Sequence, residues 1–568
     1  MRSRRSRLTM LGNRSFVLAT LTLVSAVAVA QFEGPAPLAW RWQQSSPLAP
    51  NGAPLVDGNN IYLNLGNRVY SIDRESGNTN WKFPNVQPIE GTFRRSPVLT
   101  SGVLVAAGTD KKVYGVNPAT GEMKWVYESP SAITGQPIGL GKFVAFPLEG
   151  GSFTALDATT GLSVYDSPYR SLDGIAGPLT GNGRDSVMFF DNRNKLQSIN
   201  VSSRRSNWTV PFSIRPTDGT VESAGGFVYT YSSNFLVCMN ESTGSPKWQV
   251  PVSEPMIFSP EVSGGSIIAV SRSGNAYIYS DSGALKTRKP IALGSVPLTK
   301  PTVLGKKIAF ALTNGSFTLI DAATGAVDWQ YYVRPMNEAA KAALNSGSNP
   351  GGAGGSGKGG GAGAPGGLGG GGGAGFPGGG GGAPGGLGGA QGNNPPPPVV
   401  TVPIATQIVL AGSTLLVAAG DSSILAFDKS IGVDLMSPVV KTLWPLSGDL
   451  IAGTTGQEFL FQIDDDTSGV DEKGISVTIG GKPYAFDFGK DGILAVRVSQ
   501  AKKNATIPSG RQEMVVTVSD WLGNKTVHTI SLKVDNSLPL VPRNKPANPN
   551  GPGGPGGFGG GDGGGKGG

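Results

Sequence analysis

The sequence predicts an all-β protein in which an eight-bladed β-propeller is followed by an antiparallel β-sandwich. Three observations predict this fold: a phrase that recurs about every 40 to 44 residues, short strand-like runs inside each period, and a different rhythm after residue 442. Units of this length bury their apolar faces only by packing on their neighbours, as they do in propellers and solenoids.

The repeated phrase consists of Asp or Asn, three residues, Gly, three residues and an aromatic residue. Its clearest copies are Asp73/Gly77/Trp81, Asn117/Gly121/Trp125, Asn240/Gly244/Trp248 and Asp321/Gly325/Trp329. Four copies are altered: Asp157/Gly161/Tyr165 carries Tyr, Asn200/Arg204/Trp208 lacks the Gly, Asp281/Gly283 is contracted and has no aromatic, and Asp428/Gly432 ends before one. These correlated copies predict eight structural units.

Each period also contains four short apolar runs separated by turn residues. In the second period these runs lie at 97–99, 103–107, 113–116 and 125–127. Short runs rich in Val, Ile, Phe and Tyr, bounded by Gly, Asn, Asp and Lys, are typical of strands joined by tight turns. Four antiparallel strands in each period predict a propeller blade, with its four strands side by side in one small sheet.

The phrase has a physical interpretation. An Asp or Asn after the third strand accepts hydrogen bonds from backbone amides two or three residues on, and a Gly four positions later permits a positive φ. The aromatic residue then begins the outermost strand, where it covers the gap between adjacent sheets and buries about 150 to 250 Å². We therefore interpret the Trp residues as packing groups rather than as ligand-stacking groups.

These copies resemble the pyrroloquinoline-quinone-type repeat of a β-propeller family, and the resemblance covers residues 37–440. That family includes quinone-dependent alcohol dehydrogenases and non-catalytic scaffolds, among them a lipoprotein that assists outer-membrane protein assembly. The resemblance therefore implies the propeller fold and leaves the function open.

The two ends of the array predict how the ring closes. Trp42 precedes Pro54 by twelve positions, which is the spacing between the aromatic of a clear copy and the next unit. Residues 39–42 therefore resemble an outer strand without a unit of its own, whereas the Asp428/Gly432 copy lacks an outer strand. We predict that the N-terminal strand completes the last blade, which leaves no open sheet edge.

Composition predicts the remaining organisation. Residues 1–30 are a predicted signal peptide, in which arginines precede an apolar run that ends in small residues. Residues 31–440 form the propeller, with a Gly/Pro-rich insertion at 346–398 that is predicted to be disordered, as is the tail at 540–568. Removing residues 1–30 deletes five arginines and no acidic residue, so the formal net charge of +8 becomes +3. Nucleic-acid binding therefore has little support.

Residues 443–536 have the rhythm of a sandwich. Six strand-like runs are expected at 458–463, 475–479, 484–488, 494–498, 514–518 and 528–534. The stretch from Val516 to Asn524 resembles the last hairpin of bacterial immunoglobulin-like domains, which implies a spacer or an adhesive module.

An acidic group follows the first of those strands. It comprises Asp464, Asp465, Asp466, Asp471 and Glu472. Oxygen ligands crowded in a loop can bind calcium, although the alternating spacing of a calcium loop is missing and a solvated turn is the commoner outcome. Both interpretations stay open.

Enzymatic functions find little support in the residue types. The only histidine, His528, falls on a predicted sandwich strand, and the only cysteine, Cys238, falls in an apolar run and is expected to be buried. The propeller can therefore hold neither a Ser/His/Asp triad nor a histidine-ligated zinc. The vicinal cysteine pair of the resembled quinone dehydrogenases is also missing, as is a cysteine for lipid attachment after the apolar run.

We therefore predict an exported, non-catalytic scaffold or binding protein of the cell envelope or surface, without catalytic, cofactor-binding or metal-binding residues and without a cofactor. A monomer that binds a protein partner, with no membrane span after signal cleavage, fits these observations. Binding loops are expected where Arg94-Arg95 and Arg204-Arg205 depart from the repeat. The alternatives are a quinone-binding or small-molecule-binding dehydrogenase with a divergent site, and a carbohydrate-adhesive surface protein.

Overall fold

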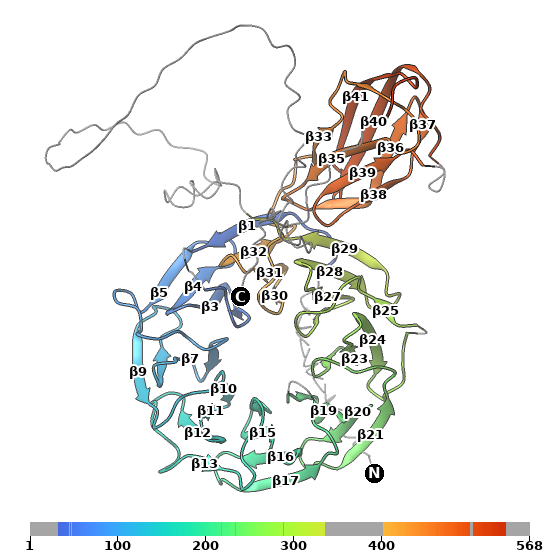
Figure 1. Ribbon diagram of the computed structural model, residues 1–568. Helices are drawn as coiled ribbons and strands as arrows, with labels where there is room; N and C mark the ends of the chain where they lie inside the picture. The colour runs from blue at the N-terminus through green and yellow to red at the C-terminus, as the bar shows by residue number, and fades with distance from the viewer. Residues whose placement is uncertain are drawn as a thin grey trace, which may run out of the picture.

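The computed structural model describes residues 32–335 and 401–540, except 45, 47, 217, 218, 233, 288 and 500–503. All regular elements in the described part are β-strands. Eight four-stranded antiparallel sheets surround a common centre, and a further pair of sheets projects beside β1 and β29 (Figure 1). The all-β class predicted from the repeat is confirmed.

The first four sheets of the ring follow the chain order. Their strands are β2 (Leu55–Asp57), β3 (Asn60–Leu65), β4 (Arg68–Asp73) and β5 (Thr79–Phe83); β6 (Val98–Thr100), β7 (Val103–Ala107), β8 (Lys112–Val116) and β9 (Met123–Glu128); β10 (Ile138–Leu140), β11 (Phe143–Leu148), β12 (Ser152–Asp157) and β13 (Tyr169–Arg170); β14 (Thr180–Gly181), β15 (Ser186–Phe190), β16 (Lys195–Asn200) and β17 (Ser206–Pro211).

The other four sheets complete the ring. Their strands are β18 (Glu222–Ala224), β19 (Phe227–Ser232), β20 (Phe235–Asn240) and β21 (Pro246–Pro251); β22 (Glu261–Ser263), β23 (Ser266–Val270), β24 (Asn275–Ser280) and β25 (Ile291–Ala292); β26 (Thr302–Leu304), β27 (Lys307–Ala311), β28 (Ser316–Asp321) and β29 (Val327–Tyr332); β30 (Val409–Ala411), β31 (Thr414–Ala418), β32 (Ser423–Phe427) and β1 (Leu38–Gln43).

The four strands of each sheet run from the centre of the ring to its rim. The first strands of successive sheets contact one another, from β6 through β10 to β30, and therefore surround the axis. The second and third strands are almost fully buried, because both of their faces pack against neighbouring sheets. The fourth strands lie at the rim (Figure 1).

Aromatic residues of the phrase connect six of the eight sheets to the next sheet. Five of these residues are tryptophans whose indole N–H donates to the carbonyl at the start of the next sheet's turn, over 2.7–3.1 Å. Tyr165 makes the same contact through its hydroxyl, which donates to the carbonyl of Val201. The indole pairs are Trp40 with Arg74, Trp81 with Pro118, Trp125 with Ala158, Trp208 with Glu241 and Trp248 with Asp281. The predicted packing role is present, together with hydrogen bonds that the sequence did not predict.

The glycine of the phrase has two roles. At Gly121 the backbone has φ of +74°, as the turn requires. A Cβ at this position would also lie 2.6 Å from an indole carbon of Trp81 in the preceding sheet. Because the indole lies directly on the glycine backbone, a side chain would displace it. Only the first of these roles follows from the sequence.

The N-terminal strand completes the eighth sheet as the spacing predicted. β1 pairs antiparallel with β32, and the guanidinium of Arg41 bridges to Asp421 at 2.6 Å. The spacing assigned the repeat aromatic to Trp42, which is a correction: Trp40 pairs with Ala426 and packs on Gly77 as the other indoles do. Trp42 instead donates to the Thr79 hydroxyl. The twelve-residue spacing located the strand and misassigned its register by two residues.

Two packed sheets follow the ring. One contains β33 (Val439–Trp444), β35 (Glu458–Asp464), β39 (Ile493–Arg497) and β38 (Phe486–Phe488), and the other contains β34 (Leu450–Ile451), β41 (Lys525–Val534), β40 (Gly510–Asp520), β36 (Val470–Ile479) and β37 (Lys482–Pro483). Their inward residues form one core that includes Phe459, Phe461 and Val516. β33 was not predicted and spans the expected boundary between residues 440 and 443.

Several sequence-based expectations lie outside the described residues. These are the signal peptide at 1–30, the insertion at 346–398 and the tail at 540–568, of which only Leu540 is described. Across the described ranges, no helix has the length and apolar character needed to cross a membrane.

Candidate functional site

The sandwich docks on the rim of the ring through the loop at residues 465–469 and through Trp521. The Trp329 indole donates to the carbonyl of Ser468 at 2.9 Å, and the Tyr331 hydroxyl donates to the carbonyl of Asp466 at 3.1 Å. In the opposite direction, the Trp521 indole donates to the carbonyl of Gln330 at 3.1 Å. The seventh repeat thus directs its indole to the sandwich, whereas five other indoles donate to the next repeat: those of Trp40, Trp81, Trp125, Trp208 and Trp248.

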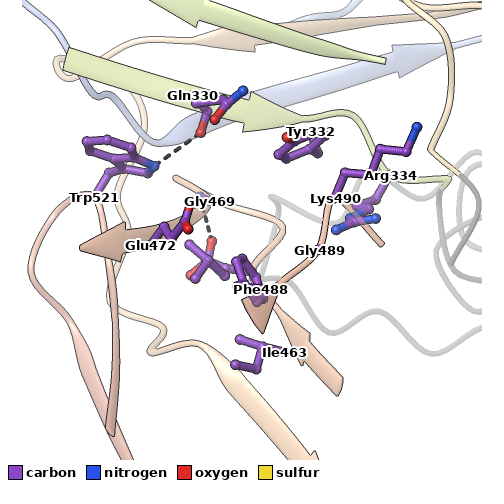
Figure 2. A pocket seen from close by; sticks show the side chains of 12 residues that line it. Gln330, Tyr332, Arg334, Ile463, Gly469, Glu472, Phe488, Gly489, Lys490 and Trp521 are labelled. Atoms are coloured by element: carbon purple, nitrogen blue, oxygen red, sulfur yellow. Dashed lines mark hydrogen bonds between the residues drawn. The ribbon is translucent and has the colours of Figure 1, made fainter. Parts of the chain in front are cut away.

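A pocket with a cavity of about 70 Å³ lies at the contact between β29 of the ring and the sandwich, which we call the seam. Figure 2 shows Tyr332, Arg334 and Lys490 toward one end and Trp521 toward the other. The remaining lining residues are Gln330, Ile463, Asp465, Gly469, Val470, Glu472, Phe488 and Gly489. This volume holds a few water molecules or one small polar group.

Arg334 is the polar group of the pocket with unmet hydrogen-bonding capacity. Its Nη1 is buried and has no hydrogen-bond partner, and its guanidinium carbon lies 5.9 Å from the centre of the Tyr332 ring. The backbone carbonyl of Arg334 accepts a hydrogen bond from Arg41 at 2.8 Å. A buried guanidinium nitrogen without an acceptor is costly, so the pocket suits water or a small anionic group.

Burial raises the pKa values of two ionisable side chains at the seam, Tyr332 and Asp466. It raises the pKa of Tyr332, and the carboxylate of Glu472 raises that pKa further. Burial also raises the pKa of Asp466, with a smaller contribution from Asp464. The phenol of Tyr332 is therefore neutral at physiological pH. The pocket offers cations, carboxylates and aromatic faces, while Cys238 and His528 both lie outside its lining.

The predicted acidic group is divided by the structure. Only Asp465 joins a cluster of carboxylates, in which its oxygen and those of Asp434 and Asp520 lie within 4.8 Å of one another. Asp471 and Glu472 lie on β36 rather than in a loop. Asp465 is partly buried in a turn, where its Oδ1 accepts backbone hydrogen bonds from residues 467–469.

The three clustered carboxylates are the residues that could hold a cation such as calcium. Each already accepts a backbone hydrogen bond through one oxygen, and the Oδ2 of Asp434 is buried without a partner. Burial raises the pKa of Asp465, and the charge of Asp434 adds to this shift against the opposing hydrogen bonds. Like charges at this separation repel one another when all three groups are ionised.

We expect Asp434→Asn to stabilise the protein at pH 7 by about 1 kcal/mol in the presence of a chelator, since the amide keeps the hydrogen bond to Met436 and removes a charge. The raised pKa of Asp465 means that this carboxyl stabilises the fold below its unfolded pKa and loses that contribution as the pH rises through its folded pKa. The gain should therefore shrink on acidification. Urea unfolding of the wild type and the variant at pH 7 and pH 4 measures this gain in stability.

Asp471→Asn is the matched control, because Asp471 lies outside the cluster and should change stability little. An Asp434→Asn variant that is less stable at pH 7 would contradict the repulsion. Added calcium that raises the wild-type melting temperature and leaves that of the variant unchanged would show that the three carboxylates hold the cation.

The other residues singled out from the sequence lie apart from the pocket. Cys238 is fully buried in the fifth sheet, and burial raises the pKa of its thiol. His528 bonds the Thr442 hydroxyl at 2.7 Å, which joins the two sheets of the sandwich. Arg204 replaces the repeat glycine at a φ of +58°, and its guanidinium lies over the Tyr165 ring. The structure does not bring Arg94 and Arg204 together in one site.

Arg334 and the loop at 465–469 were not identified as partners by the sequence argument. They are more than 130 residues apart and share no motif. Trp521 was noted only as part of a hairpin. One feature of the sequence could have pointed to this contact. The seventh repeat, which contains Trp329, is separated from the eighth unit by the insertion at 346–398.

Comparison with known families identifies the repeat. A family model described as outer membrane protein assembly factor BamB matches residues 66–211 and 192–349, which together make up half of the chain. The chain belongs to this family of PQQ-like repeat proteins. The match covers most of the ring, consistent with the resemblance noted over residues 37–440.

One curated relative is the outer membrane protein assembly factor BamB of Burkholderia pseudomallei (strain K96243). It is 24% identical over 259 residues, which cover 42% of this chain and 66% of the relative, just under two thirds of its length.

Solved structures resemble the chain in fold alone. BamB from Moraxella catarrhalis aligns with a TM-score of 0.47 and 12% identity, covering 69% of this chain and 99% of that one. A europium-containing methanol dehydrogenase aligns with a TM-score of 0.41 and 14% identity, covering 52% and 80%. At these scores neither likeness supports a function.

Proposed function

We propose that this protein is an exported, non-catalytic scaffold of the cell envelope that binds protein partners. In this proposal its ring is a closed eight-bladed β-propeller of residues 31–440, and its sandwich is an immunoglobulin-like domain of residues 443–536. The observation that carries the proposal is the family match to an outer membrane protein assembly factor. The named function of that relative is an assembly role in the envelope.

The use of the aromatic residues supports a scaffold. The indoles that a ligand could stack on are occupied between sheets, with their N–H groups bonded to carbonyls. The repeat aspartates are likewise engaged in turns: Asp321 accepts hydrogen bonds from Thr324 and Ala323, which together with Lys307 lower its pKa to about 2. Residues in these positions hold the fold together and leave the loops free to bind partners.

The seam supports a rigid arrangement of the two parts. Hydrogen bonds cross it in both directions, and Leu38 on β1 donates its backbone N–H to Thr467 at 3.0 Å. A scaffold that presents two surfaces in a fixed relation requires such a junction.

Photo-cross-linking of the full chain in its native cell tests the proposal. We expect cross-links from rim loops to other envelope proteins. Addition of pyrroloquinoline quinone and calcium to the purified chain tests the alternative of a divergent quinone enzyme. Stoichiometric uptake of the quinone with dye-linked oxidation of an alcohol would overturn the scaffold function.

A further inference from the structure

A groove of about 370 Å³ lies at the rim between the first and second sheets, where β5 and β9 are neighbouring outer strands (Figure 1). Its lining comes from the end of β5, the loop at 88–90, the turn before β8, and β8 and β9 themselves. The repeat indole of the first sheet does not fill this groove. Trp81 donates its N–H to the carbonyl of Pro118, and its ring packs on Gly121 at the turn of the second sheet.

The floor of the groove is aromatic and is held in place. Phe83 and Tyr114 are buried and meet edge to face, with ring centres 5.6 Å apart. The loop that follows β5 is fixed by Arg68, whose guanidinium donates to the carbonyls of Pro84 and Val86. Because the floor and this wall are already ordered, they lose little conformational freedom when a ligand binds.

An exposed methionine forms another wall. Met123 pairs with Val116 across the two strands, and Val126 pairs with Tyr114, so each pair shares one face of the sheet. Val116 and Tyr114 pack against the first sheet, which places Met123 and Val126 on the side of the groove. Met123 is 55% exposed and Val126 is 45% exposed. The groove therefore offers apolar surface at this end, and a methionine side chain adapts to different apolar ligands.

The opposite end of the groove is acidic. The Tyr114 phenol donates to the Oδ2 of Asp110 at 2.5 Å. Burial raises the pKa of Tyr114, and the hydrogen bond to Asp110 and the charges of nearby carboxylates raise it further. These carboxylates belong to Asp110, Glu90 and Glu128. The ammonium of Lys112, the lysine of the lining, lies 3.6 Å from Glu128. The field of the three carboxylates thus favours a positively charged ligand at this end.

The two ends are separated by the length of β8. This strand runs from Lys112 at the acidic end to Val116 beside Met123, and four residue steps along a strand span about 13 Å. An extended peptide of five residues covers the same distance, and its first, third and fifth side chains point to the same side. The groove therefore suits an extended segment with apolar side chains toward Met123 and a basic side chain toward Asp110.

We propose that this groove binds such an extended segment of a protein partner. The segment lays its apolar side chains on Met123 and Phe83, and its basic side chain reaches the carboxylates of Asp110 and Glu90. The inference rests on the proposed function, because it specifies a surface on which the scaffold binds a protein.

Fluorescence anisotropy with the full chain and a labelled, end-blocked peptide Leu-Ser-Leu-Ser-Arg tests the proposal. We expect saturable binding that weakens at least about tenfold when both leucines are replaced by serine, because buried apolar anchors contribute most of the energy of such contacts. Replacing the arginine by glutamate should also weaken binding at least about tenfold, because like charges then meet at the acidic end.

Met123→Ser removes the apolar wall and should weaken binding of the peptide about fivefold. Val327→Ser is the matched control, because Val327 pairs with Ile320 in the seventh sheet as Met123 pairs with Val116, and it is also exposed. This variant should bind the peptide as the wild type does. Since both side chains are exposed, neither substitution should change the melting temperature.

The double variant Glu90→Gln with Asp110→Asn tests the acidic end, because it removes two charges and keeps side chains of similar shape. We expect about fivefold weaker binding of the arginine peptide, a smaller salt dependence, and unchanged binding of a peptide in which glutamine replaces the arginine. Glu149→Gln is the control: Glu149 is exposed in the corresponding turn of the third sheet and should not affect binding.

Wild-type protein that does not bind the arginine peptide, or Met123→Ser protein that binds it as tightly as the wild type, would overturn the proposal. A double variant that weakens the arginine and glutamine peptides equally would overturn it as well, since the carboxylates would then not recognise the basic side chain. Envelope cross-links retained alongside any of these results would leave the proposed function standing.

Discussion

Deletion of residues 31–45 should abolish the cooperative folding of the ring or lower its melting temperature by at least about 10 °C. The deletion removes β1, which pairs with β32 along five residue pairs. It also removes Trp40, which seals the junction with the first sheet, and the bridge between Arg41 and Asp421. Circular dichroism during a thermal scan measures the effect.

The physical reason is that β1 joins the two ends of the array. Without it the eighth sheet exposes the edge of β32, and the first sheet loses the indole that covers Gly77. Exposed sheet edges also promote aggregation. Deletion of residues 554–568 is a control of equal length and should leave the melting curve unchanged. An unchanged curve after deletion of 31–45 would show that the ring does not depend on this strand.

Trp329→Ala should destabilise the protein by about 3 to 5 kcal/mol, which is the usual cost of removing a buried large aromatic. Trp329 is fully buried among Phe32, Phe317 and Phe427, and its indole holds the sandwich loop through the carbonyl of Ser468. Calorimetry should show a lower melting temperature and separate transitions for the ring and the sandwich.

Trp248→Ala is the matched control, because Trp248 holds the same place in its repeat but is only partly buried and bonds the next repeat. Trp248→Ala should lower the free energy of unfolding by less, and the ring and the sandwich should still unfold in one transition. Trp329→Phe separates packing from hydrogen bonding, since it leaves the Ser468 carbonyl unpaired at a cost of about 1 to 3 kcal/mol. If Trp329→Ala and Trp248→Ala lower the free energy of unfolding equally, the contact of Trp329 with the sandwich does not contribute more than a contact between repeats.

Much of the ring could be predicted because its information is local and repeated. The turn of each unit is fixed by residues such as Asp73 and Gly77, which lie four positions apart, and four short runs in each period indicate four strands. The pairing of β1 with the eighth sheet was also predictable, since a missing strand at one end matches an extra strand at the other. Only its register was misread, at Trp42.

The contacts between units could not be predicted from a local, repeated pattern of this kind. Gly121 was interpreted through its φ alone, although the indole of the preceding sheet also requires its bare backbone.

The sequence by itself determined most of the strands, the turns and the shortage of catalytic residue types, because each depends on neighbours in the chain or on composition. Tertiary structure alone decided that the seventh indole binds the sandwich, that Arg334 lies in the resulting pocket, and that Asp465 meets Asp434 and Asp520. Most of these pairs join segments separated by tens to more than a hundred residues. Their meeting depends on how the ring closes and where the sandwich docks, which no periodicity in the chain encodes.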